Sequence, residues 1–306
     1  MRIVTIVGAR PQIIKAAALS REINLHFKDS IEEIIVHTGQ HYDENMSEVF
    51  FRELSIPAPN VNLNVGSSSH GEQTGRMMEG IEKVLTEYRP DALVVYGDTN
   101  STLAGAVAAA KMHIPVFHIE AGLRSFNKKM PEEINRIVAD HCSTLMFCPT
   151  KTAIKNLADE GFAAGLMSPY SMDKPGVFHG GDIMFDNSVH FASIAEKQSA
   201  IIEDLKLKDT PFILATIHRN DNTDHRERLE MIFDALCLAS KNTGLPVIFP
   251  VHPRTRKMLD SWHIGQHIPT GADVQILPPA SFLDMILLEK NCSLVLTDSG
   301  GVQKEA

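Results

Sequence analysis

Cysteines, basic residues and long apolar runs are all scarce in this chain of 306 residues. The four cysteines, Cys142, Cys148, Cys237 and Cys292, form no CxxC pair. A disulfide framework is therefore not expected. The cysteines are expected to be reduced thiols in a cytoplasmic protein. No apolar segment approaches the roughly 18 residues that a membrane helix needs. The run at residues 3–9 is too short for the hydrophobic region of a signal peptide and predicts a buried first strand.

The shortage of basic residues restricts the possible ligands. Lys and Arg number 29 against 38 Asp and Glu, which gives a net charge of -9 and a pI of about 5.9. A general polyanion-binding surface for nucleic acid or acidic lipid is therefore not expected, and a phosphate ligand would need a local basic pocket. The hydrophobic content of 43% suffices for a large core, and the length favours two domains over one.

The first half of the chain has the rhythm of an α/β fold. Short apolar runs rich in β-branched residues alternate with longer amphipathic or alanine-rich stretches. The expected strands are at 2–8, 32–37, 92–96, 115–118 and 144–148, with helices at 12–26, 43–54 and 101–112. Near-continuous apolar strands of this kind predict a parallel sheet covered by helices on both faces, which is a Rossmann-like layout.

The rhythm breaks at residues 161–186, a stretch with Gly, Pro and Ser that is typical of an inter-domain connection. It resumes with expected strands at 212–217, 246–251, 274–277 and 293–297 and helices at 226–241 and 282–290. We therefore predict an α/β protein with two Rossmann-like domains, residues 1–185 and 186–306, that face each other across a cleft. The final helix is too short to complete a domain, so the second domain is expected to be incomplete.

Two polar segments follow early strands, where ligand sites of α/β folds lie. The segment from Gly8 to Lys15 enters a helix near Pro11, so the helix N-terminus with Arg10 and Lys15 is either an anion site or an ordinary turn. Asp98 follows another apolar strand. It is placed for chemistry, although this segment is equally rich in residues that cap helices.

Two further segments carry carboxylates. Glu120 ends an apolar strand and precedes a glycine turn, a position that packing hardly explains because Glu is seldom buried unpaired. Glu132 and Glu133 follow Pro131 in a predicted first helical turn, where acidic residues are expected on helix-dipole grounds alone. Their position after the Glu120 loop suggests that one of them reaches the same site.

The second half repeats the pattern, with polar groups after three expected strands at His218, at His252 and at residues 298–301. This repetition is typical of a cleft that binds phosphate. Zinc is the competing interpretation, because the pairs His37 with His41 and His263 with His267 have HxxxH spacing. Each pair encloses a glycine in a predicted loop without a neighbouring Cys/His partner, so we expect no metal site.

Taken together, these segments resemble the non-hydrolysing UDP-N-acetylglucosamine 2-epimerase family, and the resemblance covers essentially the whole chain. The shared segments occur in the family's order: Arg10-Pro11, Gly97-Asp98-Thr99, His118-Ile119-Glu120-Ala121-Gly122-Leu123-Arg124, Pro131-Glu132-Glu133-Ile134-Asn135-Arg136, His218-Arg219, Pro250-Val251-His252-Pro253 and Thr297-Asp298-Ser299-Gly300-Gly301-Val302-Gln303-Lys304-Glu305-Ala306.

The resemblance implies a glycosyltransferase-B-like fold that binds UDP in its cleft, works as a homodimer, and uses neither NAD nor a metal in its chemistry. The implied reaction inverts C2 of UDP-N-acetylglucosamine (UDP-GlcNAc) by eliminating UDP and adding it back. Such a reaction needs acid and base groups on both faces of the sugar. The motifs assign this work to Asp98, Glu120 and Glu132.

The remaining roles also follow from the resemblance. Arg10 and His218 would stabilise the departing diphosphate, where negative charge accumulates. The implied substrate-binding residues are Lys15, Arg136, His252, Ser299, Gly300, Gly301 and Glu305. Among these, Ser299 and Gly300 would bind the phosphates and Glu305 the ribose hydroxyls.

Departures from the family pattern leave alternatives open. Many members carry Glu where this chain has Gln12, and the loop at 38–43 differs from that of members activated by a second substrate molecule, so allosteric activation is not expected. Several segments are also similar to 2-epimerases of UDP-2,3-diacetamido-2,3-dideoxyglucuronic acid. A glycosyltransferase of the same fold and an inactive UDP-sugar-binding remnant are the other hypotheses. A chain ending at Ala306 is expected to be poorly folded in its second domain or inactive.

Overall fold

The computed structural model describes residues 1–39, 58–162, 165 and 167–305. The chain divides into unit 1, Met1–Asn187, and unit 2, Ser188–Ala306, whereas the sequence placed the boundary after residue 185. Helix α7 (Ile183–Gln198) runs through this boundary. The predicted helix at 43–54 and most of the loop at 38–43 lie outside the described residues.

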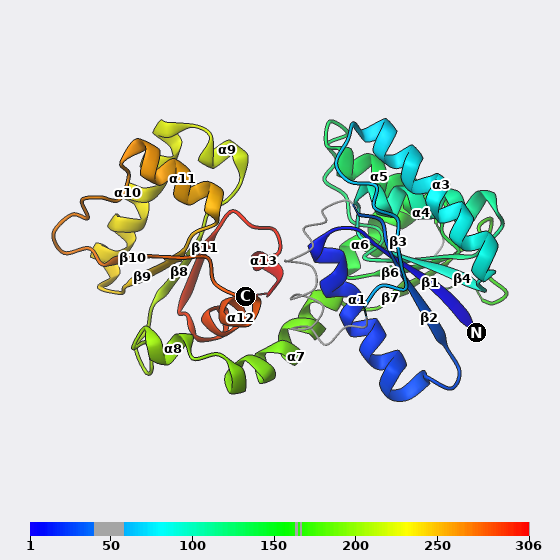
Figure 1. Ribbon diagram of the computed structural model, residues 1–306, viewed down its shortest axis with the longest axis horizontal. Helices are drawn as coiled ribbons and strands as arrows, with labels where there is room; N and C mark the ends of the chain where they lie inside the picture. The colour runs from blue at the N-terminus through cyan, green and yellow to red at the C-terminus, as the bar shows by residue number, and fades with distance from the viewer. Residues whose placement is uncertain (40–57, 163–164, 166, 306) are drawn as a thin grey trace. The chain divides into compact units, whose positions relative to one another are not determined.

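Unit 1 is built on a parallel sheet (Figure 1). Its strands are β1 (Arg2–Val7), β2 (Glu32–His37), β3 (Val61–Asn62), β4 (Ala92–Tyr96), β5 (Val116–Ile119), β6 (Leu145–Cys148) and β7 (Gly176–His179). They pair in the order β3-β2-β1-β4-β5-β6-β7, always in parallel. The predicted parallel sheet is confirmed, and its strand order reverses direction between the neighbours β1 and β4.

The helices of unit 1 cover both faces of this sheet, with α3, α4 and α5 on one face and α1 on the other (Figure 1). They are α1 (Arg10–Glu22) with a π-helical turn (Ile23–Phe27), α3 (His70–Tyr88), α4 (Asn100–Lys111), α5 (Pro131–His141) and α6 (Lys151–Asp159). Strand β7 lies within the stretch interpreted as a connection, so that interpretation was wrong for these residues. Helix α3 was not predicted, because its three glycines weaken a helical pattern.

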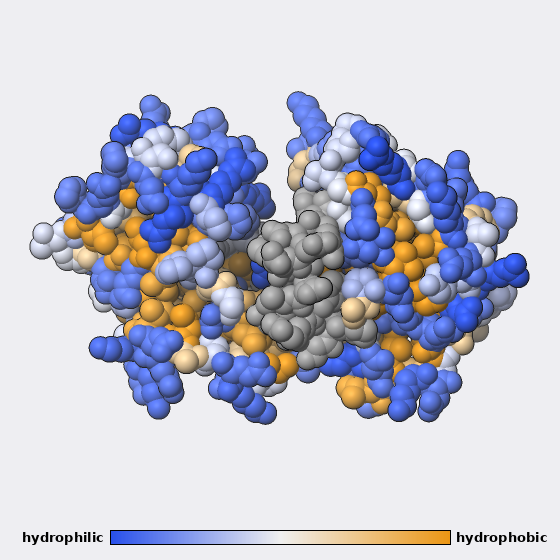
Figure 2. Space-filling model, in the orientation of Figure 1, coloured by the Kyte–Doolittle hydropathy of each residue, from blue (hydrophilic) through white to orange (hydrophobic). Residues whose placement is uncertain are grey.

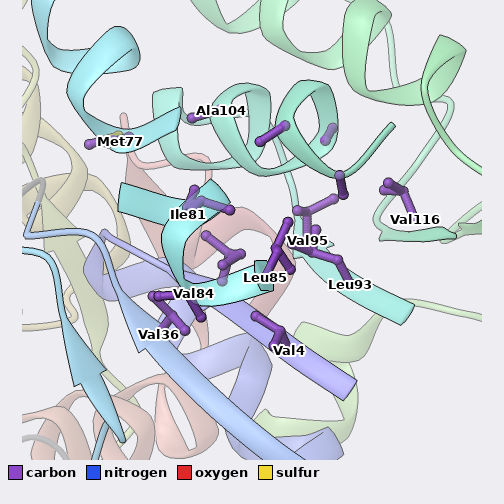
Figure 3. Packing of buried hydrophobic residues seen from close by; sticks show 14 of the residues in the cluster. Val4, Val36, Met77, Ile81, Val84, Leu85, Leu93, Val95, Ala104 and Val116 are labelled. Carbon is purple, nitrogen blue, oxygen red and sulfur yellow. The ribbon is translucent and has the colours of Figure 1, made fainter. Parts of the chain in front are cut away.

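The main core of unit 1 packs α3 and α4 onto the sheet (Figure 3). On α3, Met77, Ile81, Val84 and Leu85 recur at helical spacing and are at most 4% exposed. Helix α4 presents small residues instead, which let its backbone approach the strands closely. The other buried members of the cluster are Val4, Ile6, Ile34, Val36, Leu93, Val95, Ala104, Ala106, Ala108, Ala109, Val116 and Ala139.

Unit 2 repeats the layout with a four-stranded parallel sheet in the order β10-β9-β8-β11. Its strands are β8 (Ile213–Thr216), β9 (Val247–Pro250), β10 (Val274–Leu277) and β11 (Leu294–Thr297). Helices α10 (Arg226–Thr243) and α11 (Pro253–Trp262) pack on one face, and α8 (Ile201–Asp204) and α12 (Phe282–Asn291) on the other. The short helices α9 (Asn220–Thr223) and α13 (Val302–Glu305) follow β8 and β11. Both Rossmann-like units are therefore confirmed.

Hydrophilic residues cover much of each unit on the face shown in Figure 2, with apolar patches between them. Within the described ranges, no helix combines the length and the apolar character needed to cross a membrane.

His37 makes the stability of unit 1 depend on pH. Its ring is fully buried at the end of β2, Nδ1 accepts a hydrogen bond from the Gly39 N–H (3.0 Å), and burial lowers the pKa of His37 to about 4. Between pH 6.5 and 4 the unfolded chain binds more protons at this residue than the folded one does. The free energy of unfolding should therefore fall by about 1.4 kcal/mol per pH unit as the pH drops through this window.

Urea-dependent hydrogen exchange of β1 and β2 measures this effect. His37→Gln keeps an acceptor for Gly39 but does not titrate, so the variant should lose less stability over the same window. Equal losses in the variant and the wild type would contradict the assignment.

Candidate active site

The carboxyl ends of β1, β4 and β5 meet where the strand order of unit 1 reverses, the position at which α/β folds bind ligands. Gly8 follows β1, Gly97 and Asp98 follow β4, and Glu120 follows β5. Gly8 lies so close to α4 that a Cβ atom there would stand 2.1 Å from Ser101 Oγ. The turn after β1 is therefore tightly packed against the first turn of α4.

Glu120 is the most constrained of the predicted residues. Its φ of +72° lies in the left-handed region, which costs a non-glycine residue about 1–3 kcal/mol and is typical of functional sites. The side chain is 8% exposed and forms an ion pair with Lys15 from α1. Gly97 lies beside this pair, because its Cβ position is 3.2 Å from Lys15 Nζ and 3.3 Å from Glu120 Oε2. The structure thus brings Lys15 and Glu120 to the turn that carries Asp98.

Asp98 is held by α5. Its carboxylate forms an ion pair with Arg136, and its carbonyl accepts a hydrogen bond from Asn135 Nδ2 at 2.9 Å. The capping role that the sequence left open falls to Thr99, whose Oγ1 accepts from the Thr102 N–H. Asp98 does not cap α4, and its half-buried carboxylate, 31% exposed, can contact a ligand.

Glu132 and Glu133 have different surroundings in the first turn of α5. Glu133 is 1% exposed and accepts from the Ser125 and Phe126 N–H groups, both at 2.9 Å, and from Arg136 Nη1 at 2.5 Å. Burial alone would raise the pKa of Glu133, but these hydrogen bonds and Arg136 lower it overall. Glu132 is exposed, one helical turn before Arg136. Glu133 therefore orders the loop before α5, a role that the sequence did not reveal, and Glu132 is accessible.

The turn from β1 to α1 is organised by Gln12. Its Oε1 accepts from the Gly8 and Ala9 N–H groups at 3.0 and 3.2 Å, and its Nε2 donates to the Tyr96 carbonyl at 2.9 Å. An anion site at this turn needs free N–H groups, and those of Gly8 and Ala9 are already bound by Gln12. Arg10 is exposed at the first position of α1, where its charge is accessible to a ligand.

In unit 2, Asp298 organises the equivalent edge, beside the neighbours β8 and β11. Its carboxylate accepts from the His218 and Arg219 N–H groups, each at 3.0 Å, and from Asn222 Nδ2 at 2.9 Å. The His218 ring remains 46% exposed, with Nδ1 3.4 Å from Asp298 Oδ1. Asp298 therefore fixes the backbone of the predicted diphosphate-binding histidine.

The remaining predicted residues of unit 2 lie around this loop or next to it. Ser299 Oγ accepts from the Val302 N–H at 3.4 Å and caps α13, while Gly300 and Gly301 are exposed in the preceding turn. The Cβ position of Gly300 is 3.8 Å from Arg219 Nη2, which brings a guanidinium to the turn. His252 is exposed and caps α11. Glu305 belongs to α13, but its side chain is outside the described part.

A metal-binding group and a ligand cavity are two other kinds of functional site to compare with these residues. Among the residues that the structure describes, no group of three His, Cys, Asp or Glu side chains is arranged for a metal, and His41 lies outside them. A cavity of about 340 Å³ lies on the α1 face of the sheet in unit 1, lined mainly by apolar side chains such as Leu19, Val94 and Phe147. Its lining includes none of the predicted site residues.

The different surroundings of Glu132 and Glu133 predict different effects on stability. Glu133→Gln removes charge-assisted hydrogen bonds from a buried site and should lower the free energy of unfolding of unit 1 by roughly 2–4 kcal/mol. Glu132→Gln, the matched exposed control, should change it by less than about 0.5 kcal/mol. Hydrogen exchange of α5 and residues 124–130 in urea measures both, and equal effects would contradict the assignment.

Comparison with known proteins agrees with the motifs. The family model described as UDP-N-acetylglucosamine 2-epimerase matches residues 24–306. A UDP-N-acetylglucosamine 2-epimerase homolog of Methanococcus maripaludis is 50% identical over 307 aligned residues, covering 100% of this chain and 81% of that protein. The UDP-2,3-diacetamido-2,3-dideoxy-D-glucuronate 2-epimerase of Pseudomonas aeruginosa is 47% identical, covering 100% of this chain and 80% of that protein.

A solved structure supports the same grouping. The crystal structure of Methanocaldococcus jannaschii UDP-GlcNAc 2-epimerase in complex with UDP-GlcNAc and UDP matches with a TM-score of 0.81 and 42% identity, covering 100% of this chain and 81% of that one. The strand-end motifs, the two parallel sheets and these similarities lead to one conclusion: the chain belongs to the UDP-N-acetylglucosamine 2-epimerase family.

Proposed function

We propose that this protein inverts C2 of UDP-GlcNAc to give UDP-N-acetylmannosamine (UDP-ManNAc). The observation that carries the proposal is the pair of carboxylates Asp98 and Glu120, which follow neighbouring parallel strands and are each paired with a cation, Arg136 and Lys15. Such a pair can move protons at a sugar carbon. Membership of the family supplies the substrate class.

The chemistry requires more than one proton-transfer group. The C2 proton of UDP-GlcNAc is not activated by a neighbouring carbonyl, so UDP leaves first as C2 loses its proton, which gives 2-acetamidoglucal. UDP then adds back after C2 is protonated from the opposite face. A general base and a general acid are therefore needed on opposite faces of the ring.

We assign this proton transfer to Asp98, Glu120 and Glu132 of unit 1. Glu120 forms an ion pair with Lys15 and Asp98 forms one with Arg136, and an ionised carboxylate can accept a proton. Neither NAD nor a metal enters the proposed mechanism.

Arg10 and the groups of unit 2 would act on the diphosphate and the nucleoside. Positive charge from Arg10 and His218 would stabilise UDP as it departs. Ser299, Gly300 and Gly301 would bind the phosphates, Glu305 the ribose, and His252 would contact the substrate. The exposure of His218 and the exposed Gly300-Gly301 turn support these roles.

A second substrate is the alternative that the sequence left open. The 47% identity with the Pseudomonas aeruginosa enzyme lies between the 50% identity with the Methanococcus maripaludis UDP-N-acetylglucosamine 2-epimerase homolog and the 42% identity with the Methanocaldococcus jannaschii UDP-GlcNAc 2-epimerase. UDP-2,3-diacetamido-2,3-dideoxyglucuronic acid is therefore the next substrate to try. A remnant that binds UDP-sugars without turning them over remains the alternative outcome of the same assays.

We further propose, from the family resemblance, that the protein acts as a cytoplasmic homodimer. Sedimentation equilibrium should then give a mass near twice the 33.8 kDa of one chain. A single-chain mass at the concentration used in the assays would contradict this proposal.

Substitution of the paired carboxylates tests the proposed function. Asp98→Asn and Glu120→Gln keep shape but remove proton transfer, so each should lower kcat for formation of UDP-ManNAc by about 10²- to 10⁴-fold. Binding of UDP, measured by titration calorimetry, should change little. Glu82→Gln, on the exposed side of α3, is the matched control and should be as active as the wild type. Full activity in either carboxylate variant would refute the assignment.

A further inference from the structure

His118 contacts an acceptor with each ring nitrogen. Nδ1 lies 2.7 Å from Asp140 Oδ1, and Nε2 lies 2.8 Å from the Gly97 carbonyl oxygen. His118 and Asp140 are both fully buried. A carbonyl oxygen and a carboxylate oxygen can only accept, so both ring nitrogens have to donate.

The surroundings of Asp140 keep it ionised. Its Oδ2 accepts from the Gly122 N–H at 3.2 Å and from Arg124 Nη1 at 2.7 Å. Burial alone would raise the pKa of Asp140, but the charges of His118 and Arg124 lower it overall. With Asp140 ionised, both ring nitrogens of His118 donate, Nδ1 to Asp140 and Nε2 to the Gly97 carbonyl. Glu160 lies 2.7 Å from Arg124 Nη2 and joins the same ion cluster.

The ion cluster of His118, Asp140, Arg124 and Glu160 makes hydrogen bonds to the backbone next to both reactive carboxylates. The Gly97 carbonyl, which accepts from His118, belongs to the residue directly before Asp98. Gly122, which donates to Asp140, follows Glu120 by two residues. Gly97 also donates its N–H to the Ile119 carbonyl at 3.0 Å, which joins the ends of β4 and β5. Asp140 on α5 therefore fixes the turn of Glu120 directly and the turn of Asp98 through His118.

We propose that His118 and Asp140 are positioning residues that set the distance and orientation between Asp98 and Glu120 for proton transfer at the sugar. This inference rests on the proposed function. Neither side chain contacts solvent, so both act through the turns that they hold. Apolar residues of similar size could fill this volume without the cost of burying charge. His118 and Asp140 instead make directional hydrogen bonds next to the site, to the Gly97 carbonyl, the Gly122 N–H and the Arg124 guanidinium.

The first test separates positioning from stability. Asp140→Asn keeps the volume but cannot accept all the present hydrogen bonds, so kcat for UDP-ManNAc formation should fall about 10- to 100-fold while KM changes less than about twofold. Val116→Ala, a fully buried truncation at the start of β5, is the control for destabilisation of the same strand and should keep its kcat. If the two variants lose kcat equally, or Asp140→Asn loses none, the proposal fails.

The second test needs no variant. Nitrogen-15 NMR of the wild type labelled at histidine should show a His118 ring with both nitrogens protonated at neutral pH, each with a slowly exchanging N–H signal. An unprotonated ring nitrogen on His118 would overturn the proposal that this ring links the two turns. If the wild type converts no UDP-sugar, the proposed function fails, whereas the ring signals still decide whether His118 joins the two turns.

Discussion

The site in unit 1 depends on pairing charge at the end of an apolar sheet. The strands β4 and β5 are nearly continuous runs of apolar residues, and a lone charge next to such a core costs several kcal/mol. The structure meets this cost by pairing the carboxylates with cations, Glu120 with Lys15, and both Asp98 and Glu133 with Arg136. The same ion pairs bring helices α1 and α5 to the strand ends, so the charge balance and the geometry of the site have one origin.

In unit 2, the carboxylate at the end of the sheet is stabilised by backbone N–H donors. Asp298 takes hydrogen bonds from the N–H groups of His218 and Arg219. This arrangement leaves the His218 ring and the Arg219 guanidinium available, one exposed and the other beside Gly300. In unit 2 an anchored carboxylate thus positions a histidine ring and a guanidinium, which suits a diphosphate. In unit 1 the cations Lys15 and Arg136 position carboxylates, which suits proton transfer.

The sequence alone predicted the parallel strands and the polar residues at their ends. It did not predict the long-range hydrogen bonds that hold these residues in place. Parallel strands and their polar ends follow from apolar runs, and Glu120 was identified because a carboxylate there is hard to bury without a role. The supporting contacts join distant residues: Gln12 to Tyr96 over 84 positions, and His218 to Asp298 over 80. No local pattern encodes such contacts. The local pattern did not separate Glu132 from Glu133, because both suit a first helical turn. The family motif selected Glu132, and burial of Glu133 distinguishes the two in the structure.

Deuterium incorporation at C2 tests the central claim most directly. UDP-GlcNAc would be incubated with the protein in heavy water and followed by proton NMR. We expect UDP-ManNAc to appear and deuterium to enter at C2 of both epimers, because the proton at that carbon is lost and replaced from solvent. Binding of UDP without exchange at C2, for UDP-GlcNAc and for the diacetamido-glucuronic acid substrate alike, would contradict the account.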